Sequence, residues 1–166
     1  KPVYIGFGSM TSGDMGETLS IVLEAVRMAG VRAVLATGWG DVGTICQKDV
    51  FVVQGYVPHD WLFRHVSAVV HHGGAGTTAE GLRAGVPSVV IPFVLDQPFW
   101  GARLKALGVG PAPIPQKKLT AESLAGAIRA AVNDSAIRQR ARSIGESIRA
   151  EDGVGNAVKI VQSYFG

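Results

Sequence analysis

The chain has 166 residues, of which 47% are hydrophobic and 17% charged, so it carries enough apolar material for one packed core. This composition excludes an intrinsically disordered chain, and the length predicts a single domain over residues 1–166. Sixteen basic and thirteen acidic residues leave a formal net charge of +3, and no basic run is interleaved with aromatic residues. A nucleic-acid-binding protein is therefore not indicated. The single cysteine, Cys46, excludes an internal disulfide and any site with several cysteine ligands.

Short, nearly uniformly apolar runs bounded by Gly, Pro or polar turn residues predict five strands, at Val3–Phe7, Ala33–Ala36, Phe51–Val53, Ala68–Val70 and Ser88–Ile91. Such runs are typical of strands buried on both faces of a parallel sheet. Segments with helical spacing alternate with them, one after Gly16 and others at Thr78–Ala84 and Phe99–Leu107. The alternation predicts a doubly wound α/β domain that binds ligands at the carboxyl ends of its strands.

The amino-acid composition changes after Pro111, where a proline-rich connector leads into a helical portion that begins at about residue 120. Three helices are expected there, at Ala121–Val132, Ala136–Ala150 and Asn156–Tyr164. Thr120 is expected to cap the first of them without a full capping box, because Ser123 stands where Glu or Gln would complete it. Seven basic and three acidic residues over 117–149 are interpreted as a solvated helix face.

The stretch AVVHHGGAGTTAEG, residues 68–81, joins a buried strand to a Gly-rich turn and a helix that is expected to begin near Thr77. Small residues let the backbone approach an anion, and the free N–H groups of a helix start face it, so this stretch predicts a phosphate site. His72 is expected to contact a phosphate oxygen, and Glu80 a ribose diol. The turn supplies room and hydroxyl donors through Gly73, Gly74, Gly76, Thr77 and Thr78.

This stretch suggests two other site chemistries. His71 and His72 are adjacent, which suggests a metal site, but neighbouring side chains on a strand point to opposite faces. No carboxylate or cysteine joins them at ligand spacing, so no metal is expected. The stretch also lacks the P-loop lysine and the GxGxxG fingerprint, which argues against an NAD-dependent oxidoreductase.

Further clusters follow the other predicted strands. Asp96 and Gln97 precede a helix expected to start at Pro98, where Asp96 suits an N-cap and the pair also suits sugar hydroxyls. In QGYVPHDWLF, residues 54–63, the Tyr56 ring and the Val57 backbone suit a planar base. The residues Trp61, Leu62 and Phe63 are interpreted as core, and Gly8 and Ser9 form the first strand-to-helix turn.

The blocks YIGFGSM, GYVPHDWLF, HHGGAGTTAEGLRAGVP and PFVLDQPFWGARLKALGVG resemble the carboxyl-terminal half of GT-B glycosyltransferases of the UDP-glycosyltransferase superfamily. The likeness is strongest to sterol 3-β-glucosyltransferases and to macrolide and glycopeptide glycosyltransferases, and it covers nearly the whole chain. It implies a Rossmann-like, doubly wound parallel sheet flanked by helices, which binds a nucleotide sugar.

The resemblance also implies a role for each motif position. The diphosphate is assigned to His72 and Ser9, the ribose to Glu80, and the base to Tyr56 and Val57, with Trp39 as a contributor. Plant relatives carry Trp at the position of Tyr56, and Gly76 stands where they carry a phosphate-binding Asn, so backbone donors must suffice. The resemblance also assigns the backbone of the turn to the diphosphate, namely Gly74, Ala75, Gly76 and Thr77. It assigns two side chains to the sugar, Asp96 and Gln97.

Relatives also have an amino-terminal domain that binds the acceptor and carries the catalytic base. The resemblance therefore implies that this chain is part of a longer enzyme, holds no catalytic residue and is inactive alone. None of His59, His65 and His71 is assigned as a base. The expected reaction is inverting, metal-independent and cofactor-free transfer of a hexose, expected to be glucose, from a UDP-sugar to a hydroxyl of a hydrophobic acceptor such as a sterol.

The expected partners are UDP or UDP-glucose, the amino-terminal domain and the acceptor, with no nucleic acid. The expected location is cytoplasmic, with peripheral membrane contact through the missing domain. The acceptor, the sugar and the choice between UDP and TDP stay open. The alternative is a stand-alone nucleotide-binding or sensing module without transferase activity.

Overall fold

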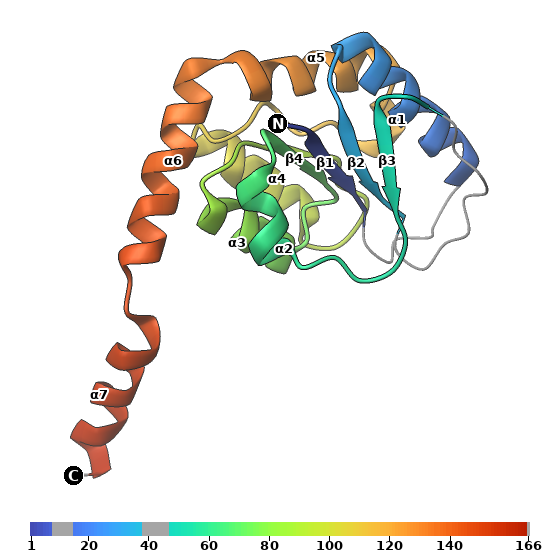
Figure 1. The fold of residues 1–166 in the computed structure, drawn as a ribbon. Coiled ribbons are helices and arrows are strands. Elements are labelled where there is room, and N and C mark those ends of the chain that lie inside the picture. The colour runs from blue at the N-terminus through green and yellow to red at the C-terminus, as the bar shows by residue number, and fades with distance from the viewer. Residues whose placement is uncertain (8–14, 38–46, 166) are drawn as a thin grey trace.

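The computed structural model describes residues 1–7, 15–37 and 47–165, and five of its segments form one parallel sheet in the order β3-β2-β1-β4-β5 (Figure 1). This confirms the predicted α/β fold, with strand ends shifted by one residue at most. The strands are β1 (Val3–Gly6), β2 (Ala33–Ala36), β3 (Val50–Val53), β4 (Ala68–His71) and β5 (Ser88–Val90). The helices are α1 (Met15–Ala29), α2 (His59–Leu62), α3 (Ala75–Ala84), α4 (Gln97–Ala106), α5 (Ala121–Asn133), α6 (Ser135–Ala150) and α7 (Gly153–Phe165), with short 3-10 turns η1 (Phe63–His65) and η2 (Gln116–Lys118).

The order of the strands reverses at β1, which pairs with β2 on one side and with β4 on the other. From β1 the chain moves outward to β2 and β3, and then returns through α2 to β4. In open parallel sheets, ligands bind outside the carboxyl ends of the strands where the order reverses. The topology therefore directs attention to the loops that follow β1 and β4.

Strand alternation builds two apolar layers. One face of the sheet, with Val3 and Ile5 at its centre, packs against α1 and α5. The other face, with Tyr4 and Val69, packs against Val57 and the residues of α2 and η1. Of the three residues interpreted as core in this second layer, Phe63 is fully buried and Leu62 half-buried, but Trp61 is 59% exposed, so that interpretation is wrong for Trp61.

The carboxyl-terminal helices begin at well-formed caps. Thr120 and Ser123 form a complete capping box, in which each side chain accepts from the other residue's amide at 3.2 and 3.0 Å. The prediction of an incomplete box was wrong because the Ser123 hydroxyl performs the reciprocal bond of a Glu or Gln. Asp134 caps α6 by accepting from the amides of Ala136 and Ile137.

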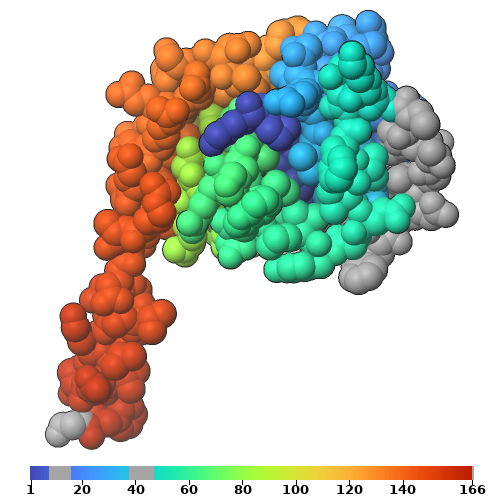
Figure 2. Space-filling model, in the orientation of Figure 1, coloured from blue at the N-terminus to red at the C-terminus, as the bar shows by residue number. Residues whose placement is uncertain are grey.

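The last two helices differ in how they contact the body. Helix α6 packs on α3, where Gly145 lies directly against Gly85 at the left-handed end of α3. Helix α7 continues away from the body (Figures 1 and 2) and has no buried residue. Its exposed apolar side chains are Val154, Val158, Ile160, Val161, Tyr164 and Phe165.

A pair of glycine-to-alanine substitutions tests the α3–α6 contact. A Cβ on Gly145 would lie 2.6 Å from the Gly85 Cα, so Gly145→Ala must push two backbones apart. We expect it to lower the free energy of unfolding by about 1–3 kcal/mol. The matched control is Gly126→Ala in α5, where nothing lies within 4 Å of the added Cβ, so stability should rise by about 0.5–1 kcal/mol. Urea unfolding of both variants measures this, and an unchanged Gly145→Ala midpoint would contradict the packing.

Candidate functional site

Three described segments meet the carboxyl edge of the sheet: the turn 54–58 after β3, the turn 72–74 after β4 and the loop 91–96 after β5. Because the strands are parallel, the ends of all of them lie at one edge. In Figure 1 the segment after β3 runs along the lower edge of the molecule to α2. Ser9, Gly8 and Trp39 lie outside the described residues, so their predicted roles stay predictions.

The turn between β4 and α3 requires glycine at its centre. Gly73 has φ +92°, and a Cβ there would lie 2.8 Å from the Val90 Cγ1 and 3.0 Å from the Gln97 carbonyl oxygen. Gly74, the N-cap of α3, has an ordinary extended backbone, and a Cβ there would meet only the His72 ring, which could move away. The close packing around Gly73 holds the backbone of the turn in one conformation.

Helix α3 begins at Ala75, two residues earlier than the predicted start at Thr77. Its first regular bond runs from the Thr78 amide to the Gly74 carbonyl, at 2.9 Å, so the amides of Ala75, Gly76 and Thr77 have no acceptor within the helix. No side chain caps them, and the first turn holds no acidic residue. These amides and the helix dipole together favour an anion at this point.

The hydroxyl of Thr78 does not belong to this surface. Thr78 is 1% exposed, and within the described part of the chain its Oγ1 has no hydrogen-bond partner. The prediction that Thr78 adds a donor for phosphate is therefore wrong. The reason is the earlier helix start, which turns Thr78 inward. Thr77 is half-buried, and Gly76 is exposed with open space where a Cβ would point.

His71 was assigned no role by sequence reasoning, yet it holds this turn. It is fully buried, and its Nδ1 accepts a hydrogen bond from the Gly73 amide at 3.1 Å. Burial lowers the pKa of His71 to about 3, so the imidazole is neutral and its proton lies on Nε2. Within the described residues that Nε2 has no partner. The signal in the sequence was the doubled histidine, of which strand alternation sends one side chain inward.

His72 stands at the opening of the turn and is half-buried. Burial lowers the pKa of His72, and the Asp96 carboxylate partly opposes this effect. Its ring lies against Gly74, next to the open amides of α3. An anion bound there would raise the pKa of His72, because it favours the protonated imidazole.

The turn after β3 and Glu80 come together through His59. Its Nε2 lies 2.9 Å from the Tyr4 hydroxyl, and its ring stacks on Phe63 with centroids 4.6 Å apart. Burial lowers the pKa of His59, and the Glu80 carboxylate acts in the opposite direction. The helices that carry the two residues, α2 and α3, contact each other. The predicted base turn leads directly into α2, which packs on the helix that carries the predicted ribose acceptor.

Within that turn, Tyr56 and Val57 face different environments. Tyr56 is 84% exposed, so its ring is open to solvent. The Val57 side chain is buried in the core layer, which anchors the backbone offered to a base. Gly55, with φ +83°, supplies the left-handed residue that turns the chain from β3 toward α2.

The loop after β5 differs from the prediction. Asp96 occupies the N-cap position of α4 with helical backbone angles, but its Oδ2 accepts from the Trp100 indole at 2.8 Å and caps no amide. The helix starts at Gln97, one residue before Pro98. Gln97 is 4% exposed, and its Oε1 accepts from the amides of Phe93 and Val94, so it positions the loop. Asp96 remains exposed toward the site, and sugar contact by either residue stays a prediction.

The described residues contain no cluster of three or more His, Cys, Asp or Glu side chains that could hold a metal ion. None of the helices in this part of the chain combines the length and apolar character that crossing a bilayer requires. The chemistry that this edge offers is a set of main-chain donors at the α3 amino end, flanked by His72, Glu80 and Asp96. That set suits a phosphorylated ligand that also carries hydroxyls.

A test of the buried imidazole uses His71→Asn, since the Asn Oδ1 can accept the same bond without titrating. The neutral His71 contributes its full stability above the unfolded pKa of about 6.5 and loses it as pH falls toward the folded pKa of about 3. We expect the unfolding free energy of the natural chain to fall by up to about 1.4 kcal/mol per pH unit in that window, and a flatter profile for His71→Asn. The control is His65→Asn at an exposed position, and equal slopes for all three chains would refute the assignment.

The chain is similar to known proteins in sequence and in fold. Residues 31–162 match the family model described as Erythromycin biosynthesis protein CIII-like, C-terminal domain. Sterol 3-beta-glucosyltransferase UGT80A2 of Arabidopsis thaliana is 44% identical over 160 residues, covering 96% of this chain and 25% of the relative. A sterol 3-beta-glucosyltransferase of Kluyveromyces lactis is 43% identical over 174 residues, covering 100% of this chain and 14% of the relative.

Solved structures show the same fold. The kitacinnamycin glycotransferase superposes with a TM-score of 0.85 at 26% identity, over 98% of this chain and 43% of that one. CalG4, the calicheamicin glycosyltransferase, superposes with a TM-score of 0.85 at 25% identity, over 99% of this chain and 42% of that one. The chain thus spans a quarter or less of these curated relatives and about two fifths of these structures. It belongs to the EryCIII-like C-terminal domain family, and its fold is that of the carboxyl-terminal half of GT-B glycosyltransferases.

Proposed function

We propose that this chain is the donor-binding domain of a glycosyltransferase that moves a hexose from a UDP-sugar to a hydroxyl group. The observation that carries the proposal is the amino end of α3, where open amides lie between His72 and Glu80 at the edge where the strand order reverses. The diphosphate accepts hydrogen bonds from the main-chain amides of Gly74 to Thr77 and contacts the His72 side chain. Glu80 accepts hydrogen bonds from the ribose hydroxyls. The base lies at Tyr56 and Val57.

The proposed reaction inverts the anomeric carbon without a metal. A base outside this chain removes the proton of the acceptor hydroxyl, whose oxygen attacks that carbon. The bond from the carbon to the β-phosphate oxygen breaks, and UDP leaves with the electron pair. The α3 amides, the helix dipole and His72 stabilise the charge that develops on UDP, which is the task a metal performs elsewhere.

Two histidines near this edge are engaged within the fold, and His72 is assigned to the diphosphate in this proposal. His71 is fully buried and hydrogen-bonded to Gly73, and the His59 Nε2 is engaged by Tyr4. We therefore assign the base, and the acceptor contacts, to an amino-terminal domain of the parent protein, so the chain alone transfers no sugar.

The names of the curated relatives supply the substrates in this proposal. Two of them are sterol 3-beta-glucosyltransferases at 43–44% identity, so UDP-glucose is the proposed donor and a sterol, or another hydrophobic alcohol, the proposed acceptor. A cytoplasmic location, with membrane contact made by the rest of the protein, goes with this choice. No further cofactor is proposed.

Calorimetric titration tests the proposed donor site. We expect saturable binding of UDP and UDP-glucose, weaker binding of NAD, and a loss of roughly tenfold in UDP affinity for Glu80→Ala, as for one charge-assisted hydrogen bond. Glu151→Ala, an exposed carboxylate beyond α6, is the matched control and should bind as the natural chain does. A folded sample that fails to bind UDP, or in which both variants weaken alike, would sink the assignment. Incubation of the chain with UDP-glucose and a sterol should yield no glycoside.

The proposed His72 contact predicts a pH dependence. Burial lowers the pKa of His72 in the free chain, and a bound diphosphate raises it, so UDP binding takes up a proton. Relative to His72→Gln, the natural chain should therefore gain roughly two- to tenfold in UDP affinity as pH is lowered from 8 to 6. Comparison with His72→Gln cancels the titration of UDP itself. A constant affinity ratio across this range would exclude the contact.

A further inference from the structure

A second hollow lies at the amino-terminal edge of the sheet, opposite the site described above. Its volume is about 540 Å³, within the range of about 300–1,000 Å³ of small-molecule pockets. Lys1, Ser67 and Pro87, which precede β1, β4 and β5, form one part of its wall. Arg138 and Arg142 of α6 form another part. This hollow, which we call the amino-edge cavity, thus uses no residue of the carboxyl edge.

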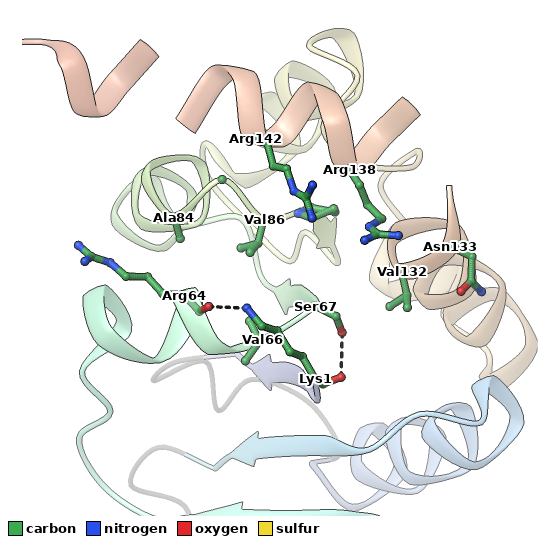
Figure 3. A pocket seen from close by; sticks show the side chains of 12 residues that line it. Lys1, Arg64, Val66, Ser67, Ala84, Val86, Val132, Asn133, Arg138 and Arg142 are labelled. Atoms are coloured by element: carbon green, nitrogen blue, oxygen red, sulfur yellow. Dashed lines mark hydrogen bonds between the residues drawn. The ribbon is translucent and has the colours of Figure 1, made fainter. Parts of the chain in front are cut away.

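The charged groups of this cavity are all positive. Arg138 and Arg142 are one helical turn apart on the same face of α6, and Figure 3 shows both side chains pointing toward Lys1 and Ser67. On that side the Lys1 Nζ donates to the Arg64 carbonyl at 2.8 Å. No aspartate or glutamate is among the lining residues.

The two arginines have no structural partner that would explain their position. Other arginines of α5 and α6 donate to main-chain carbonyls of neighbouring elements, namely Arg129, Arg140 and Arg149. Within the described residues, neither the Arg138 nor the Arg142 guanidinium forms a hydrogen bond or an ion pair. Their cationic groups are therefore available to a ligand.

The carboxylates that lie close in sequence to the cavity arginines do not line the cavity. Asp134 accepts from the first amides of α6 and serves as its cap. Asp60 and Glu146 are exposed one turn from Arg64 and Arg142, and neither lines the cavity. Arg138 and Arg142 are exposed, which agrees with the solvated-face interpretation of the basic residues in 117–149, and both also line the cavity.

We propose that the amino-edge cavity binds a phosphate monoester. Neighbouring cations repel one another, and an anion between them removes that cost. Guanidinium groups bind phosphate through paired, charge-assisted hydrogen bonds, so Arg138 and Arg142 favour a phosphate group as the ligand. A neutral ligand would leave both charges unpaired. The apolar side chains of Val66, Val86 and Val132 line the remaining wall and fit a small organic group. This inference is independent of the proposed function, since it concerns the opposite edge.

The ligand chemistry has two sources, a free phosphorylated metabolite and the headgroup of an anionic phospholipid, and the probes separate them. Glycerol 3-phosphate is titrated into the full chain, with amide shifts recorded by NMR. Flotation is measured with phosphatidylcholine vesicles, with and without phosphatidic acid. The variant is Arg138→Gln/Arg142→Gln. The matched control is Arg103→Gln/Lys105→Gln, which removes the same charge from exposed positions on α4.

We expect glycerol 3-phosphate to shift the amides of Ser67 and Arg142, and to bind roughly tenfold or more weakly to the α6 double variant than to the control. Flotation that requires phosphatidic acid and the arginine pair assigns the lipid headgroup. Binding of glycerol 3-phosphate without flotation assigns the free ester. Equal affinity of all three chains, equal weakening of both double variants, shifts confined to residues 72–77, or no binding of either probe would overturn the proposal. The UDP titration reports separately on the carboxyl edge.

Discussion

The hydrogen bond from the Gly73 amide to the buried His71 Nδ1 is the interaction on which the carboxyl edge depends. It requires a neutral imidazole, and complete burial keeps the pKa of His71 at about 3. It also requires a glycine, because Gly73 adopts φ +92° with Val90 and Gln97 in contact where a side chain would begin. These contacts hold the end of β4 against the start of α4. They also fix the direction in which the first amides of α3 point.

The loop after β5 extends this arrangement. Gln97, whose backbone touches Gly73, uses its side-chain oxygen to hold the amides of Phe93 and Val94. Leu95, between them and Asp96, has φ +58° and is 90% exposed, an unusual conformation for a residue with a branched side chain. A rotation of the α3 amino end would thus disturb the loop that presents Asp96. The turn before α3 and the loop that carries Asp96 are thus packed together through Gly73 and Gln97.

Most of the fold was predictable from the sequence, because its strands are apolar on both faces and few other structures tolerate such runs. The turn between β4 and α3 was predictable for a similar reason, since glycines followed by a helix signal leave little choice. His71 was not, because its role depends on how the turn folds back over the strand end. The sequence pattern of two adjacent histidines is the same whether the inner ring is only packed in the core or also accepts a hydrogen bond.

Other errors came from side chains with more than one partner available. Asp96 satisfies the sequence rule for an N-cap, yet the Trp100 indole one turn later competes for its carboxylate. Ser123 is shorter than the Glu or Gln of a capping box, yet it reaches the Thr120 amide. Trp61 follows the pattern of a core residue, but the short α2 leaves that side of the turn open. These outcomes depend on distances that residue order does not encode.

The thirteen residues of α7 have a further consequence for the parent protein. The helix has no buried residue, and an isolated helix of this length is only marginally stable in water. Its apolar side, with Val154, Val158 and Val161, therefore contributes to helix formation only when another surface covers it. If another surface covers this side of α7, part of the binding free energy is spent on forming the helix.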